Sequence, residues 1–342
     1  MTDIIKKKTV PFSLWGIDLL EYIKTVSDKV DWLANGFIAD NSITMLYATD
    51  GIGKSLIGIQ AALELSSGLP VFKTFDVEKK YKIIYCMAER SIKEPLKRIK
   101  SMIQDVDLAG KIDFSNFTIT TEFQGRDVGN PSEAEALLNK LKEHAEVMEG
   151  IDIVFFDPLY ALVKGDLKDD KAINGVFNFF RRVGNELGAN VFFVHHENRG
   201  SREVGATSRT GQDFYGNKFI SGLCTAVWHM VKPKDDQFKT IILNEKDSES
   251  CLLQKFSLIY DPEFNTVRAD TSVSPKNRKI LIEQFLKKQK DKGLSFDADE
   301  LYSAIGCTLH AVTQRKQLAA LVNEGLICNI APQGHKGKYK SL

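Results

Sequence analysis

One short run, ATDGIGKS from Ala48 to Ser55, constrains the fold more than any other part of the sequence. It follows an apolar segment typical of a buried strand, residues 42–48, and precedes a helical stretch, residues 55–67, that Gly68 would end. The glycines let the backbone approach a ligand closely, and the N–H groups of the loop and of the helix N-terminus attract an anion. The run therefore predicts a strand, a phosphate-binding loop and a helix in direct succession.

The residue types in this loop suit a nucleoside triphosphate bound with a divalent cation. Lys54 would reach the β- and γ-phosphates, and the Ser55 hydroxyl would bind Mg2+. Alanine replaces the glycine that usually opens such a loop, and the acidic Asp50 must point away from the phosphates. ATP and Mg2+ are the predicted cofactors; the alternative is a glycine-rich turn that serves packing alone. The predicted nucleotide-binding residues are Ala48, Asp50, Gly51, Ile52, Gly53, Lys54, Ser55 and Leu56.

The wider pattern predicts an α/β fold, because apolar strands alternate with amphipathic helical stretches over the first 200 residues. The expected sheet is mainly parallel, with helices on both faces and strands at 42–48, 82–88, 117–123, 151–157 and 190–196. After residue 220, three strands in close succession predict an antiparallel edge. The polar stretch 270–277 predicts a domain boundary. The expected parts are an N-terminal arm or helix (1–35), an ATPase domain (36–270) and a small C-terminal domain (275–342).

Polar residues end three of the predicted strands, at the edge where open α/β sheets bind ligands. Asp157 would bind Mg2+ directly or through a water, or it is simply a turn residue before Pro158. Glu89 would activate the water that attacks the γ-phosphate, or it is an acid at the start of the helix that follows. His195 and His196 point to opposite faces of their strand, so only one can face the nucleotide and the pair cannot bind a metal together. That histidine would sense the γ-phosphate; the alternative, for at least one of the two, is a partly buried histidine with satisfied hydrogen bonds.

The order of these elements, GKS, AE, FFDP and VHH followed by antiparallel strands, resembles the RecA-like ATPases over about residues 30–268. It is most similar to the RepA-type plasmid and DnaB-type hexameric helicases, and the paired histidines are typical of the RepA branch. The resemblance implies a homo-hexameric ring with ATP between subunits, in which Glu89 is the catalytic base. The catalytic set is then Lys54, Glu89, Asp157, His195 and His196.

The chain departs from this family at the arginine that a neighbouring subunit supplies to ATP. Relatives carry Arg-Gly-Ser before an Asp-Val-Val-Trp strand, whereas here Tyr215 stands for the arginine and Thr225 for the aspartate. Arg209, Lys218 or Lys246 would substitute. Because such a residue is worth ~10^3 in rate or more, weak or partner-dependent hydrolysis is expected.

Two regions are candidates for DNA binding. The segment after the fifth strand combines glycines and aromatic rings with Arg199, Arg202, Arg209 and Lys218, which suits single-stranded DNA in a ring channel; the alternative is a solvated loop. Residues 275–342 contain 12 Lys or Arg and 6 Asp or Glu, a net charge of +6, and resemble a winged helix-turn-helix domain. Such domains bind duplex DNA or dock proteins. The DNA-binding candidates in this part are Arg315, Lys316, Lys336 and Lys338.

The remaining features narrow the class of protein. The five cysteines are scattered without a C-x-x-C pair, the N-terminus lacks a signal-peptide pattern, and no apolar run reaches bilayer length. We therefore expect a cytoplasmic protein without a membrane partner. The first hypothesis is an ATP-driven hexameric helicase or translocase in replication of a plasmid, phage or other mobile element, the context resting on the resemblance. The alternatives are an ATP-switch regulator or loader that does not unwind DNA, and a recombinase-like filament.

Overall fold

The computed structural model describes most of the chain, which divides into two compact units. One unit comprises residues 1–254 and 260–267, and the other comprises residues 255–259 and 268–342. The described residues are 30–89, 91–197, 219–233, 236–248, 255–270, 275–298, 300–301, 326–329 and 338–341, with residues 19, 23–24, 318–319 and 321–322.

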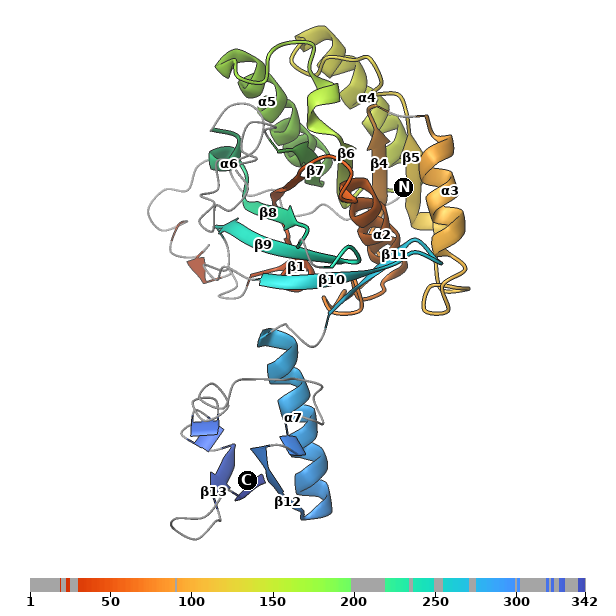
Figure 1. The fold of residues 1–342 in the computed structure, drawn as a ribbon. Helices are drawn as coiled ribbons and strands as arrows, with labels where there is room; N and C mark the ends of the chain where they lie inside the picture. Colours follow the sequence, from red (N-terminus) through yellow and green to blue (C-terminus); the bar gives the residue numbers. More distant parts are fainter. Residues whose placement is uncertain are drawn as a thin grey trace, which may run out of the picture. The chain divides into compact units, whose positions relative to one another are not determined.

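A nine-stranded sheet in the order β11-β10-β9-β8-β3-β7-β6-β4-β5 forms the centre of the fold (Figure 1). A small antiparallel hairpin of β1 (Trp32–Ala34) and β2 (Ile38–Ala39) precedes it. The five strands expected between residues 42 and 196 are confirmed, each within a few residues of its predicted ends. The strands of the large sheet are β3 (Ile43–Ala48), β4 (Ile83–Met87), β5 (Phe117–Thr120), β6 (Ile153–Asp157), β7 (Asn190–His196), β8 (Ala226–Val231), β9 (Lys239–Asp247), β10 (Lys255–Asp261) and β11 (Thr266–Ala269).

The antiparallel edge begins one strand later than expected. β8 pairs in parallel with β3, with Thr44 opposite Ala226, and antiparallel pairing begins between β8 and β9. The expectation that every strand after residue 220 is antiparallel is therefore wrong for β8. The connection from β7 to β8 spans residues 197–225, which is long enough for the crossover that a parallel neighbour requires.

Helices cover both faces of the sheet, as predicted. On one face, buried leucines of α4 and aromatic residues of α5 pack on inward-facing side chains of β4 and β6, such as Ile84 and Phe156. On the other face Tyr85 of β4 meets Gly58 of α2. The helices of this part are α2 (Lys54–Ser67), α3 (Lys93–Met102), α4 (Pro131–Met148), α5 (Asp170–Leu187) and α6 (Phe219–Leu223), with short 3-10 turns η1 (Phe114–Asn116) and η2 (Leu159–Leu162).

Helix ends follow the local sequence closely. Gly68 ends α2 in the left-handed region at φ 69°, as predicted, and donates its N–H to carbonyl oxygens of the last turn. The Asn130 side chain caps α4 by accepting hydrogen bonds from the N–H groups of Ser132 and Glu133, and Pro131 occupies the first helical position. No helix in the described part of the chain is long and apolar enough to cross a membrane.

The C-terminal unit has a small apolar core of its own. It contains α7 (Pro275–Lys292) and an antiparallel sheet in the order β12-β14-β13, formed by Ser295–Asp297, Lys338–Ser341 and Ile327–Asn329. The spacing of Leu318, Leu321 and Val322 along residues 310–324 predicts one apolar helix face that contains all three. Leu318 and Leu321 are buried, but Val322 is 37% exposed, so this prediction is wrong for Val322. The core residues are Ile282, Leu286, Phe296, Leu301, Leu318, Leu321 and Ile327.

Candidate functional site

The sheet brings the predicted site residues together at the carboxyl ends of its central parallel strands. Residues Ala48 and His196 are paired across β3 and β7, and Asp157 ends β6 opposite Met87 of β4. Glu89 follows β4 by two residues. Because β7 lies between β3 and β6, His196 stands between the phosphate-binding loop and Asp157. Four segments far apart in the sequence thus contribute to one site at the carboxyl ends of parallel strands.

The loop itself has the backbone that the glycines predicted. Gly51 and Gly53 adopt φ of 80° and 100°, in the left-handed region that side chains disfavour, and no atom lies within 4 Å of a Cβ built at either position. Gly53 is the N-cap of α2, which begins at Lys54. The backbone is therefore open to a ligand at the positive end of a helix.

Lys54 lies folded over the loop and is only 6% exposed. Its Nζ donates hydrogen bonds to the carbonyl oxygens of Ala48 at 3.0 Å and Thr49 at 2.8 Å, and lies 3.9 Å from Asp50 Oδ1. Burial lowers the pKa of Lys54, although the charges of Asp50 and Asp157 oppose this change. The ammonium group is thus held beside the loop before any phosphate arrives.

Asp157 is 4% exposed and is held by two hydroxyl groups. Tyr85 Oη donates to Asp157 Oδ2 at 2.8 Å, and the Ser55 side chain also forms a hydrogen bond with the carboxylate. Burial raises the pKa of Asp157 even though both hydrogen bonds and the charge of Arg98 favour the ionised form. The Ser55 hydroxyl and this carboxylate are the hard oxygen ligands that suit Mg2+, so the donor set fits the predicted cation. When bound, the cation would neutralise charge on the phosphates.

Glu89 lies outside the helix that follows it. The first helical residue of α3 is Lys93, its N-cap is Ile92, and the acid of its first turn is Glu94. The interpretation of Glu89 as an acid at the helix start therefore loses its support. Glu89 is exposed. Burial lowers the pKa of Lys54 and of His196, and the charge of Glu89 opposes this change at both, so Glu89 lies near these two side chains.

The two histidines occupy different surroundings. His196 Nδ1 contacts Asp50 Oδ1, and the ring meets Tyr160 edge-on with centroids 4.9 Å apart. Burial and the charge of Lys54 lower the pKa of His196, so the neutral imidazole is favoured. His195 is fully buried in the sheet. The contact with His196 also explains the acidic Asp50, which is directed to β7 beside the loop.

Sequence reasoning missed a buried polar network beside the loop. The imidazole of His229 stacks on Tyr47 with centroids 4.3 Å apart, and Glu245 accepts a hydrogen bond from Tyr47 Oη at 2.6 Å and contacts His229 Nδ1 at 3.1 Å. The Glu197 carboxylate lies 3.9 Å from His229 Nε2. No short motif marks these residues, because they come from four different strands or strand ends.

Of the residues predicted to bind DNA or to be supplied in trans to ATP, only some belong to the described part of the chain. Lys338 is exposed on β14. Lys246 Nζ donates to the carbonyl oxygens of Ser221, Gly222 and Cys224 at 3.0, 2.9 and 2.5 Å, so it binds its own chain at the end of α6. The candidates Arg199, Arg202, Arg209, Lys218, Arg315, Lys316 and Lys336, and also Tyr215, lie outside the described residues.

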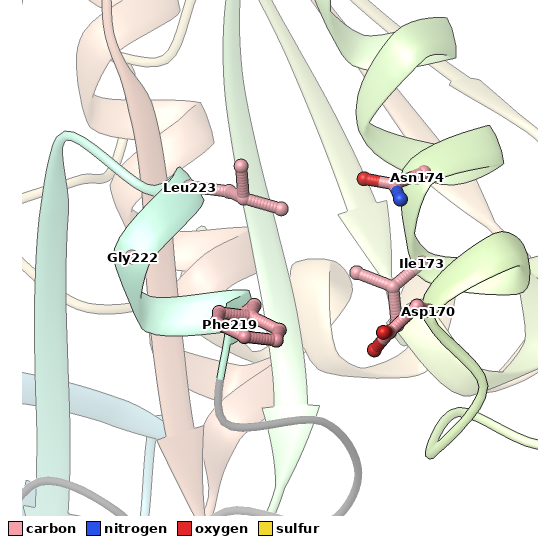
Figure 2. A pocket seen from close by; sticks show the side chains of 6 residues that line it. All are labelled: Asp170, Ile173, Asn174, Phe219, Gly222 and Leu223. Carbon is pink, nitrogen blue, oxygen red and sulfur yellow. The ribbon is translucent and has the colours of Figure 1, made fainter.

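Two further pockets lie in the described part of the chain. Figure 2 shows one of about 450 Å³, where Phe219 and Leu223 of α6 face the first turns of α5. The other, of about 580 Å³, lies near the opposite ends of the strands and is lined by acidic residues that include Asp31, Asp40 and Asp152. Neither is lined by a residue of the phosphate-binding loop.

Comparison with known proteins agrees with this geometry. A family model described as an AAA domain matches residues 17–202, which is more than half of the chain. The chain belongs to this AAA domain family. No curated protein matches it. The residues matched by the family model include the loop, Glu89, Asp157 and both histidines.

Solved structures show the same fold at low sequence identity. One described as an ATPase domain matches with a TM-score of 0.55 and 14% identity, over 73% of this chain and 95% of that one. A DnaB-like replicative helicase, described with its interactions with primase, matches with a TM-score of 0.54 and 14% identity, over 73% of this chain and 66% of that one. This AAA protein therefore has the fold of helicase ATPase domains.

Proposed function

We propose that this AAA protein is an ATP-dependent DNA helicase or translocase that works as a homo-hexameric ring. The observation that carries the proposal is the convergence of Lys54, Asp157, Glu89 and His196 at one edge of a sheet with a helicase-type fold. Lys54 and Ser55 bind the triphosphate and Mg2+, Glu89 activates water, and His196 senses the γ-phosphate. The resemblance to RepA-type proteins supports a role in replication of a plasmid, phage or other mobile element.

The contact with single-stranded DNA is assigned to the basic segment after β7. Arg199, Arg202, Arg209 and Lys218 lie in this segment together with Phe214 and Tyr215. Basic side chains follow the phosphates while aromatic rings stack on bases without sequence preference.

The residue supplied in trans is assigned to Arg209 or Lys218 rather than Lys246. Lys246 would have to break three hydrogen bonds to its own carbonyl oxygens before it could reach a neighbouring subunit. With Tyr215 at the family position of the arginine, hydrolysis depends on a neighbour or another partner.

A second candidate function follows from Tyr215, which stands where relatives carry the arginine supplied in trans. A chain without that arginine hydrolyses ATP slowly, and slow hydrolysis suits a regulator or loader that changes state with ATP but does not unwind DNA. The two functions differ in what DNA does to the hydrolysis rate, because a translocase uses each cycle to move along the strand.

Ring formation and stimulation by DNA test the proposed function. With ATP, Mg2+ and single-stranded DNA, we expect six-subunit rings in electron micrographs and a hydrolysis rate raised roughly tenfold or more, since a residue supplied in trans is worth ~10^3 or more. Reactions without DNA provide the baseline. Monomers under these conditions, together with a hydrolysis rate that DNA leaves unchanged, would rule out the helicase.

The C-terminal domain, residues 275–342, is assigned to duplex DNA through Arg315, Lys316, Lys336 and Lys338. Its net charge of +6 and its own apolar core support a separately folded basic module. Removal of these residues should weaken duplex binding and flatten its dependence on salt in a fluorescence titration, because fewer counterions are released. Binding of single-stranded DNA should persist. Unchanged duplex binding would instead favour a protein-docking role.

A further inference from the structure

A tyrosine hydroxyl lies in the middle of an otherwise apolar strand and contacts the candidate metal ligand. Tyr85 belongs to β4, is fully buried, and stacks on Phe155 of β6 with ring centroids 5.5 Å apart and an interplanar angle of 15°. Its Oη donates to Asp157 Oδ2 at 2.8 Å. Burying a hydroxyl costs free energy unless it forms a hydrogen bond, so this contact decides the position of the ring.

The helix that carries the phosphate-binding loop makes room for this hydroxyl. A Cβ built on Gly58 of α2 would lie 3.0 Å from Tyr85 Oη, closer than ordinary van der Waals contact. Glycine within a helix costs about 1 kcal/mol relative to alanine. Gly58, although unfavourable in a helix, therefore leaves the space in which the Tyr85 hydroxyl reaches Asp157. It lies one helical turn after Lys54 and Ser55.

The contact limits how the Asp157 carboxylate can turn. Tyr85 holds one carboxylate oxygen from β4, while the Ser55 hydroxyl approaches the same carboxylate from the loop side. A phenylalanine at position 85 would fill the same space and keep the stacking on Phe155, but would leave a buried carboxylate oxygen without this donor. Core packing alone therefore does not explain a tyrosine at this position.

We propose that Tyr85 is a positioning residue that fixes the Asp157 carboxylate for Mg2+, and that Gly58 is the residue that admits its hydroxyl. The inference rests on the proposed nucleotide site and adds two residues to it. Tyr85 touches neither the nucleotide nor the attacking water; it acts through Asp157. Partners that hydrogen-bond a metal ligand typically change metal affinity or activity about 10–100-fold when they are removed.

The first test measures Mg2+ dependence with the full chain. Fluorescent mant-ATP is titrated at increasing MgCl2, and the Mg2+ concentration for half-maximal tightening of binding is compared between wild type and Tyr85→Phe. We expect this concentration to rise about tenfold in the variant, while mant-ATP affinity in EDTA stays unchanged. Tyr81→Phe is the matched control, because the Tyr81 hydroxyl contacts Trp32 O at 3.4 Å, outside the site. Equal Mg2+ dependence of Tyr85→Phe and wild type would overturn the inference.

A second variant tests the same contact from the helix side. Gly58→Ala should shift Mg2+ dependence in the wild-type background, because the new methyl group displaces the Tyr85 hydroxyl. In the Tyr85→Phe background it should add nothing. Additive effects of the two substitutions would contradict the assigned role of Gly58. A wild-type chain that shows no Mg2+-dependent binding of mant-ATP would refute the proposed nucleotide site itself, and with it this inference. Wild-type binding with an unchanged Tyr85→Phe variant would refute the role of Tyr85 alone.

Discussion

Replacement of Lys54 by alanine will lower the rate of ATP hydrolysis by about 10^2–10^3-fold, the range typical of a lost preorganised charge or donor at the reacting group. The ammonium group lies over the loop and is held there by the carbonyl oxygens of Ala48 and Thr49. It therefore lies beside the loop to which the β- and γ-phosphates are assigned. Steady-state phosphate release with saturating Mg2+ measures the effect.

The matched control for this substitution is Lys111→Ala, which removes an exposed lysine of the same ATPase unit. We expect its hydrolysis rate to equal that of wild type. A Lys54→Ala chain that hydrolyses ATP within about threefold of the wild-type rate would mean that the loop does not grip the triphosphate.

Substitution of Glu89 by glutamine will remove hydrolysis while leaving ATP binding intact. General bases contribute about 10^2–10^4-fold to rate, so a loss in this range is expected in single-turnover measurements. Affinity for mant-ATP should stay near the wild-type value, because the amide has the same shape and Glu89 is exposed beside the site rather than packed into it.

Glu94→Gln tests whether Glu89 acts as the catalytic base or only as an acid that favours the start of α3. Glu94 is the acid in the first turn of α3, where a carboxylate favours the helix dipole, and it is more than half exposed. Its neutralisation should change stability slightly and leave hydrolysis unchanged. If the two substitutions lowered hydrolysis by the same factor, a shared effect on α3 would explain both and Glu89 would not be the base.

Much of the fold could be predicted because its local signals are strong. The strand ends near Ala48, Asp157 and His196 follow from apolar runs that stop at polar residues, and Gly68 ends α2 where the sequence indicated. The direction of β8 could not be predicted in this way. Its sequence has the same apolar pattern whether it pairs in parallel or antiparallel, and the choice depends on the path of the connection from β7.

The site could be predicted only where a residue type is unusual for its position. Lys54, Ser55 and Asp157 stood out because charged and hydroxyl groups interrupt glycines or end an apolar strand. Tyr85 did not stand out, because a tyrosine within an apolar strand looks like an ordinary core residue. Its role depends on Gly58 of another element, which only the packing of α2 on β4 brings within reach.

The network around His229 was missed for a related reason. Its members lie on β3, β8 and β9 and just after β7, so no spacing along the chain connects them. Only the order of strands in the sheet brings Tyr47, Glu245 and Glu197 around one imidazole. The assignment of Glu89 also needed the structure, because the start of α3 at Lys93 separates a strand-end acid from a helix-start acid.

The coupling of ATP hydrolysis to strand separation is the central claim, and a strand-displacement assay tests it most directly. A forked DNA with one labelled strand is incubated with Mg2+, ATP and either wild type or Lys54→Ala. We expect wild type to release the labelled strand and Lys54→Ala to release none, with both proteins bound to the fork. Failure of the wild type to release the strand while it hydrolyses ATP on the same DNA would contradict the helicase and favour the ATP switch.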